Sequence, residues 1–232
     1  MKKQLIKKIF VGLAVFILAR SASATLNSDG DFQYWSTEAV EGKINDQWKV
    51  YVEEEFRFGD DASKFYYHHT QLEPGYKVND WLEIAPAYRQ VWELDTKLAK
   101  KDHWFEEERP MFNVTVKHKW NGWEISDRNR FEYRFFEIKE DRFRYRNKIT
   151  LKSPWKWTSW NINPFIADEI FVEEGVTGTP CGYNRNRLYG GVGFQIISHL
   201  KGELFYLWQS KDSVKDNWID FNVIGTKLKF EF

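Results

Sequence analysis

The sequence predicts an all-β chain that closes into an antiparallel up-and-down β-barrel of the transmembrane type. Charged and apolar residues alternate over long stretches, the chain begins with a segment typical of export signals, and it ends on an alternating segment with a C-terminal aromatic residue. A period of two is typical of β-strands, because successive side chains of a strand lie on opposite faces.

The alternation is clearest in Glu124–Arg134 and Arg142–Lys152, where most of the polar positions are charged. The residues between them, among them Ile125, Phe131 and Tyr145, are mostly apolar. A soluble antiparallel sheet buries its apolar face and exposes a mixed polar face. Here arginine dominates the polar face, and outer-membrane barrels have strands that are apolar outside and polar inside. The pattern therefore favours a barrel with an ionic lumen.

Residues 1–24 have the features of a secretory signal peptide. Four lysines precede the apolar run Ile9–Ala19, and Ala22-Ser23-Ala24 suits cleavage after Ala24. The apolar run is too short for a spanning helix, which needs ~20 residues. We therefore expect residues 25–232 to form a single barrel domain in the outer membrane of a Gram-negative-type bacterium, with outer-membrane lipid as a partner.

The composition fits an exported barrel better than a nucleic-acid-binding protein. Residues 1–24 contain five basic and no acidic residues, so cleavage leaves 29 Lys+Arg against 34 Asp+Glu, a net charge of about −5. The single cysteine, Cys181, cannot form an internal disulfide. Aromatic residues make up 18% of the chain, with twelve tryptophans, and aromatic side chains are enriched at membrane interfaces.

Most segments with strand character span ten residues or so, the length that a tilted strand needs to cross a bilayer, whereas strands of soluble proteins average about five or six. Because bacterial single-chain barrels have even strand numbers, we expect about ten strands beginning at Gln47, with twelve as the alternative. The segments are Phe32–Glu38, Gln47–Phe58, Lys64–Tyr76, Trp81–Glu93, Pro110–Trp120, Trp123–Phe136, Arg142–Lys152, Asn161–Val172, Arg185–Ile197, Leu200–Gln209 and Trp218–Phe232.

The first of these segments, Phe32–Glu38, does not fit an even count. We expect residues 25–46 to be a periplasmic or lumen-packed segment in which Phe32–Glu38 pairs only locally. Tight turns such as Asn121-Gly122 alternate with longer polar loops such as Leu94–His103, which predicts short turns at the periplasmic end and long loops outside. The last strand ends on Phe232, an ending typical of strands read by the outer-membrane assembly machinery, which we expect as a partner.

The inward residues predict a network of arginines and glutamates. Like charges directly opposite each other on neighbouring strands repel, so carboxylates must lie between the arginines. A barrel this narrow is nearly filled by side chains, which favours a structural ion-pair network; the alternative is a small anion-preferring pore or a lumenal site for a small anionic solute. The candidate lumen-binding residues are Glu53, Glu55, Arg57, Arg128, Arg130, Glu132, Arg134, Arg144, Arg146, Glu169, Arg185 and Arg187.

Some residues do not fit the alternation. Asp127, Asn129 and Asn147 fall on the nominal lipid face, so they lie beyond the hydrocarbon or a bulge shifts the register. Pro86 and Pro164 fall inside strands, where each missing N–H donor requires a bulge or a bend.

Several runs together resemble the domain of unknown function 2490 family, over essentially residues 30–232. The runs are Phe32–Trp35, Asp127–Arg134, Arg144–Lys148, Ala167–Glu169 and Asn184–Gly191. The resemblance implies an exported bacterial protein that forms an outer-membrane barrel. It implies no activity.

Two other functions remain as alternatives. An outer-membrane surface hydrolase could use Asp102-His103, and a secreted soluble ligand-binding β-barrel would reverse the facing and place the aromatic residues inside. Neighbouring strand residues point to opposite faces, so His68 and His69 do not easily share a metal ion. We therefore expect no metal or cofactor and assign no catalytic residue.

Overall fold

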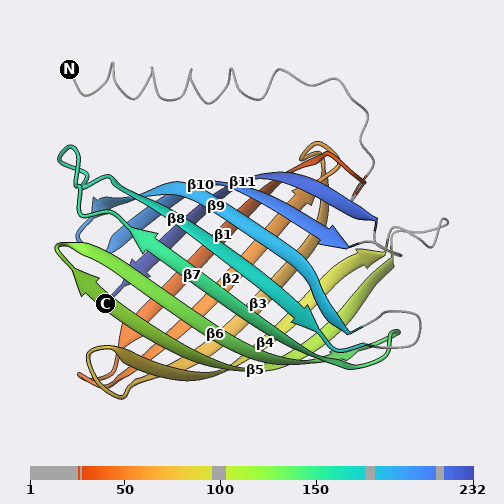
Figure 1. The fold of residues 1–232 in the computed structure, drawn as a ribbon, viewed down its shortest axis with the longest axis horizontal. Helices are drawn as coiled ribbons and strands as arrows, with labels where there is room; N and C mark the ends of the chain where they lie inside the picture. Colours follow the sequence, from red (N-terminus) through yellow and green to blue (C-terminus); the bar gives the residue numbers. More distant parts are fainter. Residues whose placement is uncertain (1–25, 27, 96–102, 176–180, 213–216) are drawn as a thin grey trace.

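The computed structural model of the chain describes residues 26, 28–95, 103–175, 181–212 and 217–232 (Figure 1). The all-β prediction is confirmed, and the described residues include no helix long and apolar enough to cross a membrane. The expected signal peptide, residues 1–24, lies outside the described residues. The strands are β1 (Asp31–Lys43), β2 (Trp48–Gly59), β3 (Lys64–Lys77), β4 (Leu82–Asp95), β5 (His103–Trp120), β6 (Trp123–Phe136), β7 (Arg142–Lys152), β8 (Asn163–Glu173), β9 (Gly182–Ile197), β10 (Leu200–Asp212) and β11 (Trp218–Glu231).

The eleven strands that the described residues form make one closed barrel, as the sequence predicted (Figure 1). Strands adjacent in the chain pair antiparallel, and β1 pairs in parallel with β11 from Asp31↔Phe221 to Glu41↔Glu231. In a meander with an odd number of strands, the first and last strands run in the same direction, so their seam has to be parallel. The strand number lies between the expected ten and the alternative twelve.

The expectation for Phe32–Glu38 was wrong, because this segment belongs to β1 and forms part of the barrel wall. It pairs with β11 on one side and with β2 on the other. Its side chains alternate like those of the other strands: Gln33, Trp35 and Thr37 are buried in the lumen, whereas Glu38 is exposed on the outer face. The assumption of an even strand number excluded a segment whose own pattern is that of a strand.

The two ends of the barrel have different connections. The end that we call the turn end holds the short β1–β2, β3–β4, β5–β6 and β9–β10 connections, residues 153–162 and the C-terminus (Figure 1). The opposite loop end holds connections 60–63 and 137–141. The predicted Asn121-Gly122 turn is present, and its φ angles of 48° and 81° fit the left-handed conformations that a two-residue hairpin requires.

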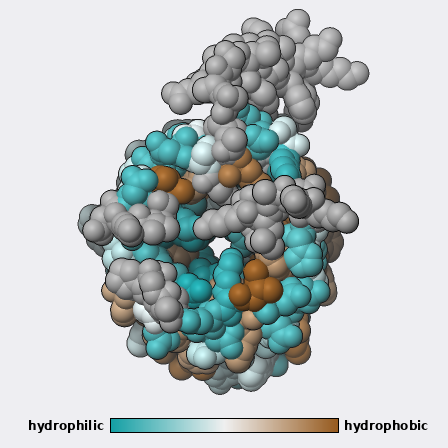
Figure 2. Space-filling view, turned by 90° about the vertical axis from the view of Figure 1, so that its right-hand side faces the viewer, coloured by the Kyte–Doolittle hydropathy of each residue, from teal (hydrophilic) through white to brown (hydrophobic). Residues whose placement is uncertain are grey.

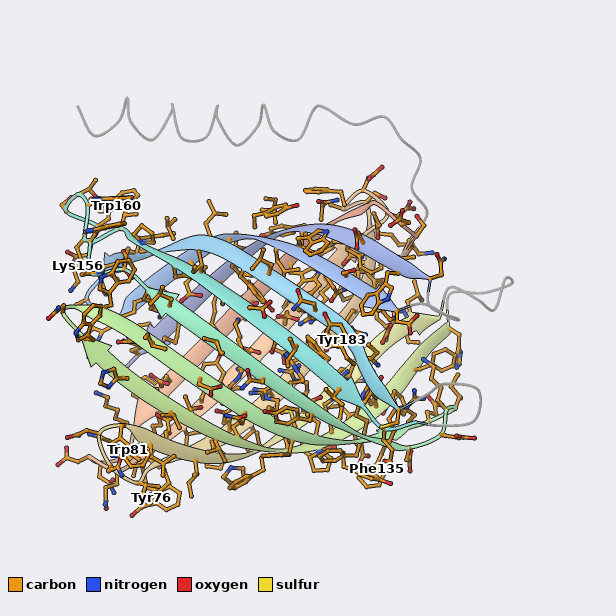
Figure 3. All side chains as sticks on the ribbon, viewed as in Figure 1. Tyr76, Trp81, Phe135, Lys156, Trp160 and Tyr183 are labelled. Atoms are coloured by element: carbon orange, nitrogen blue, oxygen red, sulfur yellow. The ribbon has the colours of Figure 1, made fainter. Side chains whose placement is uncertain are left out.

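The outer face is apolar and aromatic, whereas the inner face carries most of the charge. Trp48 and Phe131 are 43% and 41% exposed on the outside, whereas Glu132 is fully buried inside. Aromatic side chains gather at both ends of the wall: Trp81 lies at the turn end and Phe135 at the loop end (Figure 3). This arrangement follows directly from the alternation in the sequence.

Asp127, Asn129 and Asn147 lie on the outer face, but no bulge occurs between β6 and β7. The polar groups instead satisfy one another. Asn147 Nδ2 donates hydrogen bonds to Asp127 Oδ1 (2.5 Å) and Asn129 Oδ1 (3.1 Å), and the Tyr145 hydroxyl donates to Asn129 Oδ1 (2.5 Å). Mutual hydrogen bonding therefore takes the place of the register shift that we considered.

Pro86 and Pro164 are also accommodated without a register shift. The β3–β4 ladder is interrupted between the pairs Leu72↔Tyr88 and Tyr76↔Ile84, and Pro86 lies in this gap. Pro164 pairs with Val192 in a continuous part of the β8–β9 register. Of the bulge or bend that we expected, the bulge is therefore absent at both prolines.

The packing around Gly225 generates a first prediction. A Cβ atom at this position would overlap the ring of Phe205, whereas a Cβ at Gly190 would meet no atom within 4 Å. We expect Gly225→Val to lower the free energy of unfolding by about 1–3 kcal/mol through overpacking. Gly190→Val should change it by less than about 0.5 kcal/mol. Urea unfolding in detergent micelles, followed by tryptophan fluorescence, measures both; equal effects would contradict the close packing.

Candidate functional site

The structure places all the predicted lumen residues on the inner wall, and brings most of them into one ionic network. Glu132 on β6 is fully buried and lies opposite Arg144 on β7. Arg144 Nε donates a 2.6 Å hydrogen bond to Glu132 Oε2, and Arg146 Nη1 donates a 2.9 Å hydrogen bond to Oε1. Arg130 Nη1 lies 3.8 Å from the same Oε1. This one carboxylate therefore compensates arginines from two strands.

Arg146 connects Glu132 to a second buried carboxylate, Glu169 on β8. Its Nη2 donates a 2.7 Å hydrogen bond to Glu169 Oε1. Arg128 Nη2 donates to the same oxygen at 3.2 Å, and Arg187 Nη1 lies 3.6 Å from Oε2. Charge-assisted contacts of this kind link β6, β7, β8 and β9 into one unit.

A third group of ion pairs lies nearer the loop end. Arg134 donates to both oxygens of Glu107, at 2.7 and 2.9 Å, and also to Glu173. Arg109 Nη2 lies 2.7 Å from Glu107 Oε1. The sequence interpretation did not include Glu107, Arg109 or Glu173 among the candidates. Glu107 and Arg109 were left out because this strand was expected to begin at Pro110. The alternation of the strand nevertheless continues through both residues.

Glu53, Glu55 and Arg57 on β2 form the opposite side of the network. Arg57 Nε donates a 2.8 Å hydrogen bond to Glu55 Oε1. His69, which was not among the candidate lumen residues, is fully buried, and its Nε2 lies 3.2 Å from Glu53 Oε1. His68 faces outward, with its ring stacked 4.5 Å from that of Trp92. The prediction that the two histidines point to opposite faces is confirmed.

Aromatic rings compensate part of the arginine charge. The guanidinium carbons of Arg146, Arg187, Arg185 and Arg144 lie 4.6, 4.9, 5.2 and 5.7 Å from the ring centre of buried Phe171. Cations are attracted to aromatic faces, with gains of ~0.5–2 kcal/mol depending on desolvation. Phe171 therefore acts as a second kind of partner for arginines that share few carboxylates.

Trp35 on β1 does the same at the barrel seam. The guanidinium carbon of Arg57 lies 3.7 Å from a Trp35 ring centre and that of Arg187 lies 4.9 Å from it. The Trp35 indole N–H donates a 3.0 Å hydrogen bond to Gln33 Oε1. β1 thus contributes a buried aromatic platform between side chains of β2 and β9.

One side of the lumen is apolar, which sequence reasoning missed. An apolar cluster lines the inner face of β1 and of β8–β11. On these strands, inward positions as well as outward positions carry apolar side chains. The buried members of the cluster are Trp35, Phe165, Ala167, Tyr189, Leu207, Phe221 and Val223. The lumen is therefore filled by an ionic network on one side and an apolar cluster on the other.

Carboxylates in the middle of the lumen are buried, whereas the side chains at its turn end are more exposed. Glu132 and Glu169 have exposures of 0% and 1%, whereas the side chains of Lys49 and Lys117 at the turn end are 27% and 39% exposed. Viewed along the barrel from the loop end, hydrophilic residues surround a central hollow (Figure 2). This arrangement holds a layer of fixed, buried charges on the wall of the lumen.

The structure also bears on the histidine, cysteine and carboxylate groups that we considered. No three His, Cys, Asp or Glu side chains among them are placed to hold a metal ion. Of the Asp102-His103 pair that we considered for a hydrolase, Asp102 lies outside the described residues. His103 begins β5, and its ring packs edge-on against Phe105 at 4.9 Å.

The burial of Glu132 generates a second prediction. Glu132→Gln removes the negative charge and leaves arginines uncompensated, so the free energy of unfolding should fall by about 3–5 kcal/mol. Glu124→Gln, on the same strand but with a half-exposed side chain 3.6 Å from Lys119, should cost less than about 1 kcal/mol. Urea unfolding in detergent compares the two. If both variants are equally stable, the buried network does not hold the barrel together.

The chain matches none of the curated proteins with which it was compared. The family model described as "Protein of unknown function (DUF2490)" matches residues 32–220, from β1 to the beginning of β11. The match covers most of the barrel wall and confirms the resemblance seen in the sequence. The chain therefore belongs to the DUF2490 family of proteins of unknown function.

Proposed function

We propose that this protein is an outer-membrane β-barrel with a closed lumen that serves as a structural envelope protein. The observation that carries the proposal is the inverted distribution of side chains: large apolar residues are exposed around the outside, while arginines and glutamates are buried inside. Soluble monomers rarely expose apolar patches larger than a few hundred Å². A lipid environment accounts for such a surface, and transmembrane barrels have this facing.

The wall supports the same proposal. Each strand is hydrogen-bonded on both sides, so no backbone edge would face lipid. Exposed tryptophans at the turn end suit a membrane interface. Trp81 and Trp160 lie there (Figure 3), and Trp120 ends β5 at the same end. With the C-terminus in the periplasm, the turn end faces inward and the loop end faces outward. The last strand, β11, together with Phe232 that follows it, is the segment that we propose the assembly machinery reads.

The buried middle layer favours a closed structural barrel over a channel. A solute crossing it would have to displace the Arg144–Glu132–Arg146 contacts, and breaking a buried ion pair costs about 3–5 kcal/mol. A narrow anion-preferring pore is the second candidate. It is favoured by the charge of the lumen as a whole, because among the described residues six arginines and five carboxylates are classed as buried.

Lipid contact can be tested with the protein's own tryptophans. In vesicles of lipids brominated in the acyl chain, we expect strong quenching of tryptophan fluorescence. Trp208→Phe, which removes an outer-face ring that is 37% exposed, should lower the quenchable fraction, whereas Trp35→Phe, inside the lumen, should not lower it. A protein that stays monomeric in water without detergent and shows no quenching would contradict the proposal.

Conductance separates the two candidate functions. Purified protein inserted in a planar lipid bilayer should show no steady conductance if buried ion pairs block the middle layer of the lumen, as we propose. Insertion is checked separately by co-flotation with vesicles. A steady anion-selective current would contradict the closed barrel and establish the pore.

A further inference from the structure

Two cations face each other in the lumen near the loop end without the compensation found elsewhere. Arg185 on β9 and Lys211 on β10 are directly opposite in the β9–β10 register. They continue the inward series of their strands, in which Arg187 and Gln209 are buried. Like charges directly opposite on paired strands repel each other.

No described carboxylate lies within ion-pair distance of this pair. Neither side chain makes an ion pair or a side-chain hydrogen bond with another described residue, and Arg185 Nε is buried without a hydrogen-bond partner. Glu173 is engaged elsewhere: one oxygen accepts from Arg134, and the other accepts from Asn184 Nδ2 at 2.7 Å. Glu93 acts electrostatically on Lys211, and Glu173 acts on both cations, but neither carboxylate is within ion-pair distance of the pair. The local balance of charge is therefore positive.

The surroundings hold Arg185 in place for a ligand. Its guanidinium carbon lies 5.2 Å from the ring centre of Phe171, which is fixed in the core of the network. A guanidinium stacked in this way keeps N–H groups at its edge available to an acceptor. The ammonium of Lys211 adds rotatable donors from the neighbouring strand.

We propose that Arg185 and Lys211 form a binding site for a small oxyanion of the phosphate or sulfate class. A tetrahedral oxyanion offers adjacent oxygens to the planar guanidinium and another to the ammonium. The site lies on the loop-end side of the closed layer, so an anion that enters from this end binds there and goes no further. The proposal rests on the closed ionic lumen of the proposed function, not on the membrane in which the barrel lies.

Thermal unfolding of the full chain in a detergent free of phosphate groups tests the site. Inorganic phosphate and sulfate should each raise Tm saturably by about 3 °C or more, and chloride at the same ionic strength should not. Arg185→Gln and Lys211→Gln should abolish the rise. Lys201→Gln is the matched control, because this lysine of the same strand pairs with Glu231 at the turn end and should leave the rise intact.

A charge reversal gives a test that does not depend on loss of stability. Lys211→Glu places a carboxylate opposite Arg185, so Tm in phosphate-free buffer should exceed that of the unmodified protein, and phosphate should add nothing. A phosphate response that persists in Lys211→Gln or Lys211→Glu, or that chloride reproduces, would overturn the site. If phosphate raises Tm but the barrel conducts in a planar bilayer, only the closed lumen is overturned. If phosphate does not raise Tm and the barrel does not conduct, only the binding site is overturned.

Discussion

Charge compensation between neighbouring strands is the constraint on which the rest of the structure depends. Arginines packed into a narrow lumen are costly unless each meets a carboxylate or an aromatic face. Glu132 and Glu169 meet this need through Arg146, which reaches both. These contacts require one register, because a slip of one residue would turn every charged side chain toward the outside. The network and the barrel wall therefore depend on each other.

β1 completes this arrangement. By pairing in parallel with β11, it closes the wall and brings Trp35 between Arg57 and Arg187. Trp35 also belongs to the apolar cluster of β8–β11. A single strand thus joins the ionic and the apolar halves of the lumen. A barrel without it would leave two open edges and remove the platform on which two arginines lie.

The sequence predicted the facing of the strands because a period of two is a local property. It could not predict the partners within the lumen. Arg134 reaches Glu107 across 27 positions of the chain and Arg146 reaches Glu169 across 23, and both contacts depend on how strands pair. Two errors had more specific causes. The even-number rule removed β1 from the wall, and Pro110 was taken as a strand boundary although proline also occurs inside the strands of this barrel.

The choice of arginine over lysine explains how the lumen holds an excess of cations. A guanidinium binds a carboxylate at its edge and still presents a flat face to an aromatic ring. Arg146 uses both, with Glu132 at its edge and the Phe171 ring 4.6 Å from its centre. A lysine ammonium has no flat face that can lie against an aromatic ring, so its charge depends more strongly on an anion nearby. Where Lys211 stands opposite Arg185, no described carboxylate lies within ion-pair distance, and the compensation that fills the rest of the lumen is incomplete at this position.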